Sequence, residues 1–464
     1  MRHRFHAFIL APVAAMLLTA CSFSFVSSKD SAISTKQTTA TVECTLQEED
    51  RFLHVEGTDI LNQDGEKIYL RGTNAGGLFV QESWMVFTSS PDLLNTYNVI
   101  ETLYGEGTAF ELLDVYENSF WKEEDFQNCK DLGFNALRLP ISYMDVYETD
   151  FALLYQQPTA EQLRNLPLTV REKHLQKIDK FILDARKYGL YVILDLHGAF
   201  GSQNGNDHSI DSRQHDWLWN TDETGEEYRN LNVKLWKQLA TRYKDFDNIA
   251  AYDLMNEPAG DNSNGTDNTT TTGKIQWDHF DTLYKEIRAI DPRHIIIIES
   301  CWDASNLPNP SQYGWENIVY QYHHYEWSNQ DDDEFQYNSH LAKVRNLVSA
   351  NYGVPIYMGE FRVFGSDDCS AFARVINLYN ENNLHWTTWT YKVKGWSNWG
   401  LYCVPNWEDD QPKAAIIRSV DNCDDFFVIR EKWEAQRNGQ TRNDVLCDAI
   451  VNALQKANKE GENQ

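Results

Sequence analysis

The sequence predicts an α/β protein built on a (β/α)8 barrel, the TIM barrel fold, with long loops at the C-terminal face of the strands. Three observations carry this prediction. Short apolar runs alternate with amphipathic helical patterns, which is typical of βαβ units and a parallel sheet. Several runs are apolar throughout, as strands buried on both faces require. Eight such strands can be marked, and 464 residues suit one enlarged barrel.

The expected strands are short and are separated by longer polar or helical stretches. Residues 191–194 (Tyr-Val-Ile-Leu) and 295–298 (four isoleucines) are the clearest examples. We expect the eight strands to end near Gly72, Leu139, Leu196, Met255, Glu299, Tyr322, Gly359 and Tyr391.

Three helices between these strands are clear from an apolar period of 3.6 residues. The first covers residues 175–185 and is followed by Gly189, in the place of a C-terminal cap. The second covers residues 231–243, and the third covers residues 280–290 and stops at an Asp-Pro pair. One apolar face per helix is the norm, so we interpret these stripes as core.

The length beyond a minimal barrel falls in three segments that we interpret as loops. They are residues 79–122, residues 198–225 and the segment after Trp396. Long loops at the carboxyl ends of barrel strands build the walls of a deep cleft, so this arrangement favours an enclosed binding site.

The N-terminus has the pattern of an export signal. Arg2 and Arg4 are followed by an apolar run over residues 7–18, which is too short to span a bilayer. The next residues, Leu-Thr-Ala-Cys, resemble a bacterial lipoprotein signal in which Cys21 becomes the lipidated first residue. Plain secretion with cleavage nearby is the alternative. Either way, we expect an extracytoplasmic protein, and the lipoprotein signal implies a lipid anchor to a membrane.

We therefore divide the chain into three parts. Residues 1–21 are the expected signal peptide, ending at the lipidated cysteine. Residues 22–50 are rich in Ser, Thr, Lys and Gln, which predicts a flexible tether. Residues 51–464 are expected to form a single catalytic domain, which we expect to act as a monomer.

Composition excludes some classes of function. The formal net charge of −28 argues against nucleic-acid binding, which needs a basic face, whereas a neutral polymer is an easy partner. The chain has 15 Trp, 23 Tyr and 22 Phe, which suits stacking against sugar rings, although most of these aromatic residues are expected in the core. Seven cysteines follow Cys21 and show no zinc-binding spacing. Seven is odd, so at least one is free or pairs between chains.

Polar residues gather where the expected strands end, which is where barrel enzymes carry their catalytic groups. They are Arg138, His197, Asn256, Glu257, His323, Tyr325, Glu360 and Trp389. Glu257 and Glu360 follow the fourth and seventh strands, on opposite sides of the barrel, so both carboxyl groups can face one sugar. Two carboxyl groups ~5–5.5 Å apart hydrolyse a glycosidic bond with retention of configuration.

The remaining polar residues can support such a pair. Arg138 beside Glu360 would keep a nucleophile ionised, and His323 and Tyr325, two residues apart in an extended segment, could orient both carboxylates. The acid is expected to have a raised pKa. A structural salt bridge for Arg138 and a packing network for His197 are the alternatives.

These motifs, in this order, resemble glycoside hydrolase family 5, the cellulase-type retaining β-glycanases. The motifs are Leu137-Arg138-Leu139-Pro140, Leu194-Asp195-Leu196-His197-Gly198, Leu254-Met255-Asn256-Glu257-Pro258, His323-His324-Tyr325, Gly359-Glu360 and Trp389. The resemblance implies that Glu257 is the acid/base and Glu360 the nucleophile, and that Asn256 binds the sugar 2-hydroxyl. It implies that Trp389 forms the floor of the −1 subsite, within a supporting shell of Arg138, His197, His323 and Tyr325. It implies no metal and no organic cofactor.

Two further segments are similar to the exo-β-1,3-glucanase branch of the family. Residues 74–84 match an Asn-x-Gly-Gly-x-x-Val-x-Glu-x-Trp motif, and residues 197–205 continue the likeness through Asp207. In that branch, the acidic residues that match Glu82 and Asp207 bind the outer hydroxyls of the terminal glucose. Asn206 departs from the branch, because fungal members have an aromatic residue there.

The sequence thus predicts a retaining β-glycosidase that acts on a β-glucan or related oligosaccharide, with exo-action on β-1,3-linked glucose. An endo-β-1,4-glucanase or mannanase of the same family is the alternative within the enzyme class. A non-catalytic, sugar-binding surface lipoprotein is the alternative outside it. Glu257, Glu360, Asn256 and Arg138 are all present, which favours catalysis.

Overall fold

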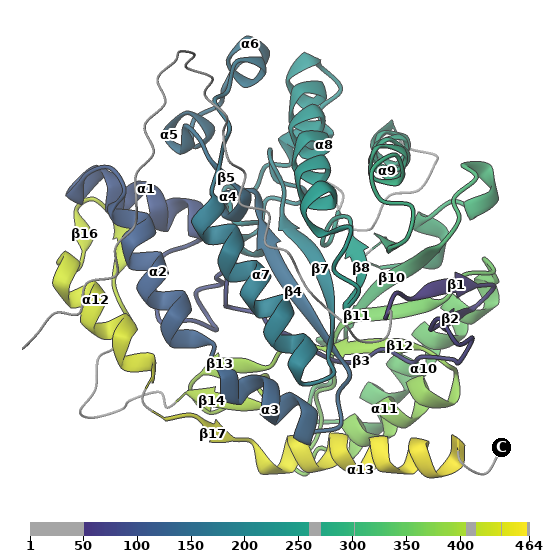
Figure 1. The fold of residues 1–464 in the computed structure, drawn as a ribbon. Coiled ribbons are helices and arrows are strands. Elements are labelled where there is room, and N and C mark those ends of the chain that lie inside the picture. The colour runs from purple at the N-terminus through teal and green to yellow at the C-terminus, as the bar shows by residue number, and fades with distance from the viewer. Residues whose placement is uncertain (1–50, 259–270, 301, 405–413, 438, 462–464) are drawn as a thin grey trace, which may run out of the picture. The chain divides into compact units, whose positions relative to one another are not determined.

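The computed structural model describes residues 51–258, 271–300, 302–404, 414–437 and 439–461, which belong to one compact unit. Its centre is a closed barrel of eight parallel strands (Figure 1), as predicted. Each strand pairs with the next barrel strand in the chain, and the last pairs with the first. The barrel strands are β3 (Arg71–Asn74), β4 (Ala136–Ser142), β7 (Tyr191–Gly198), β8 (Ile249–Asp253), β9 (Ile295–Glu299), β10 (Ile318–Tyr325), β11 (Ile356–Arg362) and β12 (His385–Thr388).

Helices follow most of the strands and cover the outside of the barrel (Figure 1). They are α3 (Glu123–Asp131), α7 (Glu172–Lys187), α8 (Glu223–Tyr243), α9 (Thr271–Arg288), α10 (Asp333–Ala350) and α11 (Ser370–Glu381). The three helices predicted from apolar stripes are α7, α8 and α9, and Gly189 follows α7 with a φ of +77°. After β12, helix α13 (Asp444–Gly461) packs against α11 and continues the outer layer.

Side chains along each barrel strand point alternately outward and inward, and they belong to two separate apolar cores. Leu137, Leu139, Val192 and Leu194 point outward into the layer under the helices. Between them, residues such as Tyr191 and Ile193 point into the barrel, where they form a small apolar cluster with residues of the neighbouring strands. Two residues further along β7 the inward position is Asp195, so the interior changes from apolar to charged toward the carboxyl ends of the strands.

A hairpin of β1 (His54–Glu56) and β2 (Asp59–Leu61) precedes the barrel. Leu53 and Ile60 are buried in the same apolar cluster as the inward residues of the strands. The hairpin therefore closes the N-terminal end of the barrel and leaves the carboxyl ends of the strands as the open end.

Two segments expected to be loops are more ordered than predicted. Residues 79–122 contain α1 (Leu93–Tyr104) and α2 (Thr108–Phe120), and the side chain of Asp92 caps α1 by accepting from the Asn95 N–H. Their apolar faces, including Leu112 and Tyr116, join the main core, because the helix α12 (Phe426–Glu434) packs against α2. The prediction failed because these apolar residues are scattered among polar ones and find their partner only at the far end of the chain.

The segment after Trp396 also adds small strands rather than an open loop. These are β14 (Tyr402–Val404), which pairs with β13 (Lys392–Lys394) and β17 (Thr441–Arg442), and the pair β15 (Ile417–Ser419) and β16 (Asn422–Cys423). Residues 198–225 hold two 3-10 turns, η1 (Asp207–Ser209) and η2 (Trp217–Trp219). The short elements α4 (Tyr143–Val146), α5 (Phe151–Leu154), α6 (Ala160–Arg164), η3 (Ala304–Asn306), η4 (Pro310–Gln312), η5 (Ala435–Arg437), β5 (Tyr147–Glu148) and β6 (Thr169–Val170) complete the fold.

Some expectations lie outside the described residues. The signal peptide with Cys21 and the tether over residues 22–50 are among them. Within the described part of the chain, no helix is long and apolar enough to cross a membrane. The five cysteines described there, Cys129, Cys369, Cys403, Cys423 and Cys447, are free thiols.

Candidate active site

A cavity of about 610 Å³ opens at the carboxyl ends of the barrel strands. Four acidic side chains line it: Glu82, Asp207, Glu257 and Glu360. Six aromatic side chains line it: Trp84, Trp302, Tyr325, Trp327, Trp389 and Trp399. The other lining residues are His197, Asn206, His208 and Asn256. Eight of the ten predicted catalytic and substrate-binding residues line this cavity. The other two, Arg138 and His323, are buried and contact the carboxylates of the cavity.

Glu360 lies in β11, one residue after Gly359. Its carboxylate receives two hydrogen bonds, from Nη1 of Arg138 to Oε1 at 2.8 Å and from the hydroxyl of Tyr325 to Oε2 at 2.8 Å. Gly359 leaves room for the side chain of Gln321, since a Cβ atom there would lie 2.4 Å from Gln321 Oε1. The carboxylate is thus held by a cation and a hydroxyl group, with one edge toward the cavity.

Glu257 follows β8 and has a backbone φ of +41°, which turns the chain sharply after the strand. Its two carboxylate oxygens contact two histidines. Nδ1 of His323 lies 2.9 Å from Oε1, and Nε2 of His208 lies 3.0 Å from Oε2. Burial alone would raise the pKa of Glu257. His208 and His323 outweigh this effect through their charges and their hydrogen bonds, and they lower the pKa of Glu257 well below its usual range. The prediction of a raised pKa for the acid is therefore wrong.

The two glutamates face each other across the cavity. One carboxylate oxygen of Glu257, one of Glu360 and a ring nitrogen of His323 all lie within 4.8 Å of one another. A separation of this size suits a carboxylate that attacks a sugar carbon while the other protonates the departing oxygen. It is shorter than the ~6.5–9.5 Å that an intervening water molecule would need.

Arg138 is fully buried in β4 and is surrounded by carboxylates. Its guanidinium nitrogens lie 2.8 Å from Asp253, 3.0 Å from Asp195 and 2.8 Å from Glu360. Glu299 is 3.9 Å away. Burial opposes the charge of Arg138, but the surrounding carboxylates raise its pKa well above the usual value. Arg138 is thus the shared cation of a buried acidic layer beneath the cavity.

The carboxyl groups of that layer are drawn toward the protonated state. Burial raises the pKa of Asp195 to about 7 and that of Asp253 to about 6, although Arg138 opposes both shifts. Burial and the neighbouring charge of Asp253 raise the pKa of Glu299 well above its usual value. The layer therefore holds protons at neutral pH, which reduces the repulsion among its members.

His197 and Trp389 form one wall of the cavity. Their rings are parallel, with an interplanar angle of 4° and centroids 5.4 Å apart. Nδ1 of His197 contacts Asp195 at 2.6 Å, and burial lowers the pKa of His197 well below its usual value, so the ring is neutral. Trp389 was expected within the eighth strand, but β12 ends at Thr388. The N–H of Trp389 still donates to the carbonyl of Phe361 in β11, whereas that of Thr390 donates to the carbonyl of Trp399, outside the barrel.

Asn256 and Asn74 complete the surroundings of Arg138. The Asn256 side-chain oxygen accepts from Nη2 of Arg138 at 2.9 Å, and that of Asn74 accepts from Nη1 at 3.2 Å. The amide group of Asn74 donates to the carbonyls of Gly359 and Thr388. These contacts tie β3, β4, β11 and β12 together directly below the two facing carboxylates.

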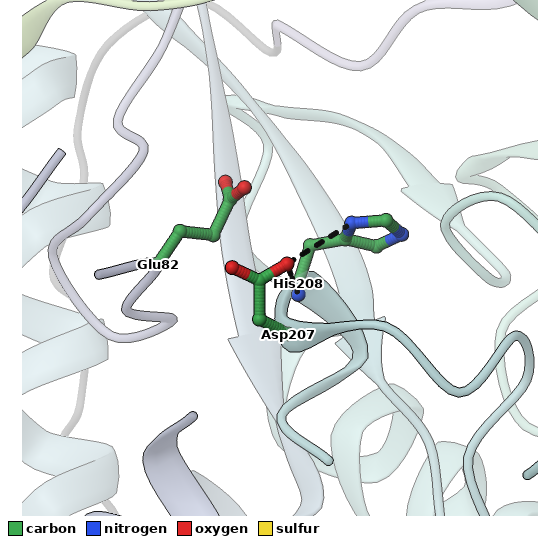
Figure 2. A group of neighbouring side chains, drawn as sticks. All are labelled: Glu82, Asp207 and His208. Atoms are coloured by element: carbon green, nitrogen blue, oxygen red, sulfur yellow. Dashed lines mark hydrogen bonds and ion pairs between the residues drawn. The ribbon is translucent and has the colours of Figure 1, made fainter. Parts of the chain in front are cut away.

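A second acidic group lies at one end of the cavity. Figure 2 shows Glu82, Asp207 and His208, with the carboxyl groups of Glu82 and Asp207 converging on the same space beside the imidazole. Ligand atoms of the three side chains lie within 4.8 Å of one another. Glu82 also accepts from the indole N–H of Trp84 at 2.8 Å, and burial raises the pKa of Glu82 to about 8. Burial disfavours a charged His208, but Glu257 raises the pKa of His208 to about 10.

Aromatic rings surround the cavity mouth. The Trp399 ring centroid lies 5.2 Å from that of Trp84 and 5.9 Å from that of Trp327, and Trp327 stacks on Tyr325. The side chain of Trp327 is 60% exposed. An exposed flat ring in the lining of the cavity offers an apolar surface to the face of a sugar outside the reacting position.

Sequence reasoning missed several residues of this site. His208 was passed over although it follows Asp207 directly, and Trp302 and Trp399 lie in segments without a recognisable pattern. Asp195, Asp253 and Glu299 left a signal, because each is an acidic residue in an otherwise apolar strand. A charge in such a strand needs a buried partner, and Arg138 is the buried cation that supplies it.

Three groups of described side chains bring carboxylates and an imidazole close enough to hold a cation: Glu82, Asp207 and His208; Asp114, Glu117 and His174; and Glu257, His323 and Glu360. Side chains of these groups already form ion pairs or hydrogen bonds with charged residues of the protein. Lys177 pairs with Asp114 and Glu117, and Arg138 pairs with Glu360. His208 and His323 both contact Glu257. We therefore assign none of these groups to a metal.

A (β/α)8 barrel with two glutamates facing each other in a cavity at its carboxyl end defines a retaining glycoside hydrolase. The family model described as Cellulase (glycosyl hydrolase family 5) matches residues 102–395. The chain belongs to glycosyl hydrolase family 5, which confirms the family prediction.

Individual relatives are more distant. A β-xylosidase of Phanerodontia chrysosporium is 25% identical over 393 residues, which is 79% of this chain and 75% of the relative. A probable glucan 1,3-beta-glucosidase A of Aspergillus fumigatus is 28% identical over 261 residues, 55% of this chain and 56% of the relative. A glucan 1,3-beta-glucosidase of Candida oleophila is 28% identical over 309 residues, 62% of this chain and 65% of the relative.

Among solved structures, an endogalactoceramidase is similar with a TM-score of 0.56 and 18% identity, covering 86% of this chain and 84% of that one. A rutinosidase from Aspergillus niger is similar with a TM-score of 0.51 and 17% identity, covering 70% of this chain and 90% of that one. These structures support the barrel fold.

Proposed function

We propose that this enzyme hydrolyses β-glucans from their chain ends, releasing glucose from β-1,3-linked chains. Glu360 is the nucleophile and Glu257 the acid/base. The observation that carries the proposal is the pair of carboxylates within 4.8 Å of each other, one held by Arg138 and Tyr325 and the other by two histidines.

In the first step, the carboxylate of Glu360 attacks the anomeric carbon of the sugar in the −1 position. Glu257 donates its proton to the departing glycosidic oxygen, and a glycosyl ester on Glu360 is formed. Arg138 and Tyr325 hold Glu360 in position for the attack. Asn256, held by Arg138, binds the 2-hydroxyl, and Trp389, stacked on His197, supports the ring.

In the second step, water enters from the side that the leaving group has vacated. Glu257, now a carboxylate, removes a proton from this water, which attacks the anomeric carbon and breaks the ester to Glu360. Two inversions leave the released sugar in its original β-configuration. The tyrosine–glutamate hydrogen bond re-forms fully when Glu360 regains its charge.

The linkage and the exo mode are supported by two kinds of observation. Curated relatives include glucan 1,3-beta-glucosidases, although the first two of these align over 56% and 65% of their length. Glu82 and Asp207 converge at one end of the cavity, where a terminal sugar would present its outer hydroxyls. Carboxyl oxygens are strong acceptors for such hydroxyls, and a chain that continued in this direction would meet their side chains.

Replacing Glu82 by alanine is expected to lower kcat/KM for release of the terminal glucose by roughly 10- to 150-fold. This follows from the loss of hydrogen bonds to a charged group, about 1.5–3 kcal/mol, and applies above about pH 8, where Glu82 is ionised. The measurement is initial rates on β-1,3-gluco-oligosaccharides of defined length, with products resolved by chromatography. Glu56→Ala changes an exposed glutamate of the N-terminal hairpin and serves as the matched control.

The same experiment decides between exo- and endo-action. An exo-acting wild type releases glucose from the first minutes, and Glu82→Ala slows this release without new products. Early accumulation of long fragments from β-1,3-glucan, β-1,4-glucan or mannan by the wild type would instead support the endo-acting alternative. A wild type that cleaves none of these polymers and no aryl β-glycoside would favour the sugar-binding lipoprotein.

We also propose that the enzyme works outside the cytoplasm as a monomer, anchored through a lipid on Cys21. The support is the basic, apolar and Leu-Thr-Ala-Cys pattern of the first residues. Replacing Cys21 by serine is expected to move the enzyme from the membrane fraction to the soluble fraction, measured by immunoblotting of separated fractions. Cys369→Ser, a free thiol in the barrel domain, is the control. Soluble wild-type protein would support plain secretion.

A further inference from the structure

We propose that His208 shares the acid–base proton with Glu257. The proton rests on His208 between turnovers and moves to Glu257 when the leaving oxygen of a substrate is in place. This inference rests on the proposed role of Glu257 and makes His208 a positioning residue for its proton.

The two histidines that contact Glu257 differ in their position and in their exposure to the cavity. His323 contacts Oε1 from within the barrel, and its side chain is fully buried. His208 contacts Oε2 at 3.0 Å, lines the cavity, and has a side chain that is 19% exposed. Oε2 is therefore the oxygen on the cavity side, and the group that holds it in the absence of substrate is His208.

A third residue, Asn204, favours the position of the proton on Glu257. The amide nitrogen of Asn204 lies 2.7 Å from the same Nε2 of His208. The orientation of this amide is fixed, because its oxygen accepts from the Asn206 N–H at 3.0 Å and its nitrogen donates to the carbonyl of Glu257 at 3.1 Å.

Nε2 of His208 thus has a carboxylate acceptor on one side and an N–H donor on the other. A protonated Nε2 donates to Glu257. A deprotonated Nε2 accepts from Asn204, and Glu257 then carries the proton. When the proton is on His208, Glu257 accepts a hydrogen bond from it and one N–H of Asn204 faces the protonated ring nitrogen. When the proton is on Glu257, that N–H gains Nε2 as its acceptor, which partly offsets the cost of moving the proton.

Charges on all sides of the pair favour keeping one proton in it. Glu82 and Asp207 lie beside His208 (Figure 2), and the ring of His197 lies 6.2 Å away. Glu257 is faced by His323 and by Glu360. The carboxylates of Glu257 and Asp207 stabilise the cation of His208, while the leaving oxygen needs a neutral, protonated Glu257.

The proton balance is closed over one turnover. On substrate binding the proton passes from Nε2 of His208 to Oε2 of Glu257, and from there to the leaving oxygen as the glycosidic bond breaks. In the second step Glu257 takes a proton from water as the new C–O bond forms, and this proton returns to His208. No other donor or acceptor is consumed.

The test is the pH profile of kcat/KM for His208→Asn with two aryl β-glycosides of the sugar that the enzyme releases. Phenol is a poor leaving group and needs the acid, whereas 2,4-dinitrophenol does not. For the phenyl glycoside, we expect the variant to lose ~10-fold or more on the alkaline side of the optimum. Its alkaline limb should move to lower pH by more than ~1 unit, because Glu257 alone must keep the proton. For the dinitrophenyl glycoside, a change below about 3-fold is expected.

Two variants make the outcomes distinguishable. Glu257→Ala should be far more impaired on the phenyl than on the dinitrophenyl glycoside, and if it is not, the proposed acid/base is wrong. If Glu257→Ala behaves as expected but His208→Asn is equally slowed on both substrates with an unmoved alkaline limb, only the proton-sharing inference is overturned. His54→Asn, which changes a histidine paired with Glu56 on the N-terminal hairpin, is the control.

A direct measurement covers the case in which His208→Asn does not fold. The chain has 13 histidines, and selective ¹⁵N-labelling allows their ring nitrogens to be followed by NMR in wild type and in Glu257→Gln. We expect one cavity histidine to titrate at markedly lower pH in Glu257→Gln. If no histidine changes its titration in that variant, the shared proton is refuted.

Discussion

Replacing Glu360 by alanine is expected to reduce kcat/KM on β-glycosides by ~10³-fold or more, as removal of a covalent nucleophile does. The loss should appear in kcat, because the carboxylate forms its bond only during the reaction. It should also persist with good leaving groups, since every leaving group requires the attack. The measurement is steady-state kinetics on an aryl β-glycoside and on a β-1,3-gluco-oligosaccharide.

The control for this prediction is Glu299→Gln, which leaves both facing glutamates in place and alters a buried carboxyl group of the layer below. Folding of each variant is checked by circular dichroism. A Glu360→Ala enzyme that kept more than about a tenth of its wild-type rate would mean that another group attacks the sugar.

The largest effect on stability is expected from Arg138→Met. This change leaves Asp195, Asp253, Glu299 and Glu360 without the cation that they share. Removing one partner of a buried ion pair costs about 3–5 kcal/mol, because the remaining charges stay in a medium of low polarity. We expect this loss in the free energy of unfolding by denaturant, together with loss of activity.

The loss in the free energy of unfolding caused by Arg138→Met should grow as the pH rises. Asp195 and Asp253 have folded-state pKa values of about 7 and about 6, above those of an unfolded chain. The folded state therefore binds more protons than the unfolded state, and stability decreases between about pH 4 and pH 7. Without Arg138 these pKa values rise further, so the same decrease becomes larger and extends to higher pH.

Arg164→Met is the matched control. Arg164 is half exposed and pairs with Glu227 at 2.9 Å on the surface, where such pairs contribute about 0–1 kcal/mol. If both arginine variants lost stability equally, or if the Arg138→Met deficit did not depend on pH, the buried acidic layer would not be the origin of the effect.

The fold was predictable because barrel strands leave local signals. All eight expected strands are present, and runs such as residues 191–194 and 295–298 are buried completely, as their composition required. The helices α1, α2 and α12 were not predicted. Their apolar faces contact one another across more than three hundred residues of chain, so no local period identifies their partner.

The candidate site was predictable where strand position alone places a residue. The pair Glu257 and Glu360 lies where the order of the strands puts it, and Arg138, His323 and Tyr325 contact these two carboxylates. Their catalytic roles remain predictions. The low pKa of Glu257 could not be foreseen, because it depends on His208, which a loop after β7 brings to the carboxylate.

The aromatic mouth of the cavity escaped prediction for the same reason. Trp84, Trp327 and Trp399 come from three loops, and only the folded chain brings the Trp399 ring centroid to 5.2 Å from that of Trp84 and 5.9 Å from that of Trp327. Composition indicated an excess of aromatic residues but could not separate these rings from those of the core. Loop residues are positioned by the scaffold as a whole rather than by their neighbours in sequence.

The most direct test of the proposed mechanism is to trap the glycosyl ester. A 2-deoxy-2-fluoro-β-glycosyl fluoride of the released sugar reacts slowly, because it lacks the 2-hydroxyl contact that strengthens in the transition state. The wild-type enzyme is incubated with this reagent, digested and examined by mass spectrometry. We expect one added sugar, on the peptide that contains Glu360. A label on another residue, or inactivation without any label, would contradict the assignment of Glu360 as the nucleophile.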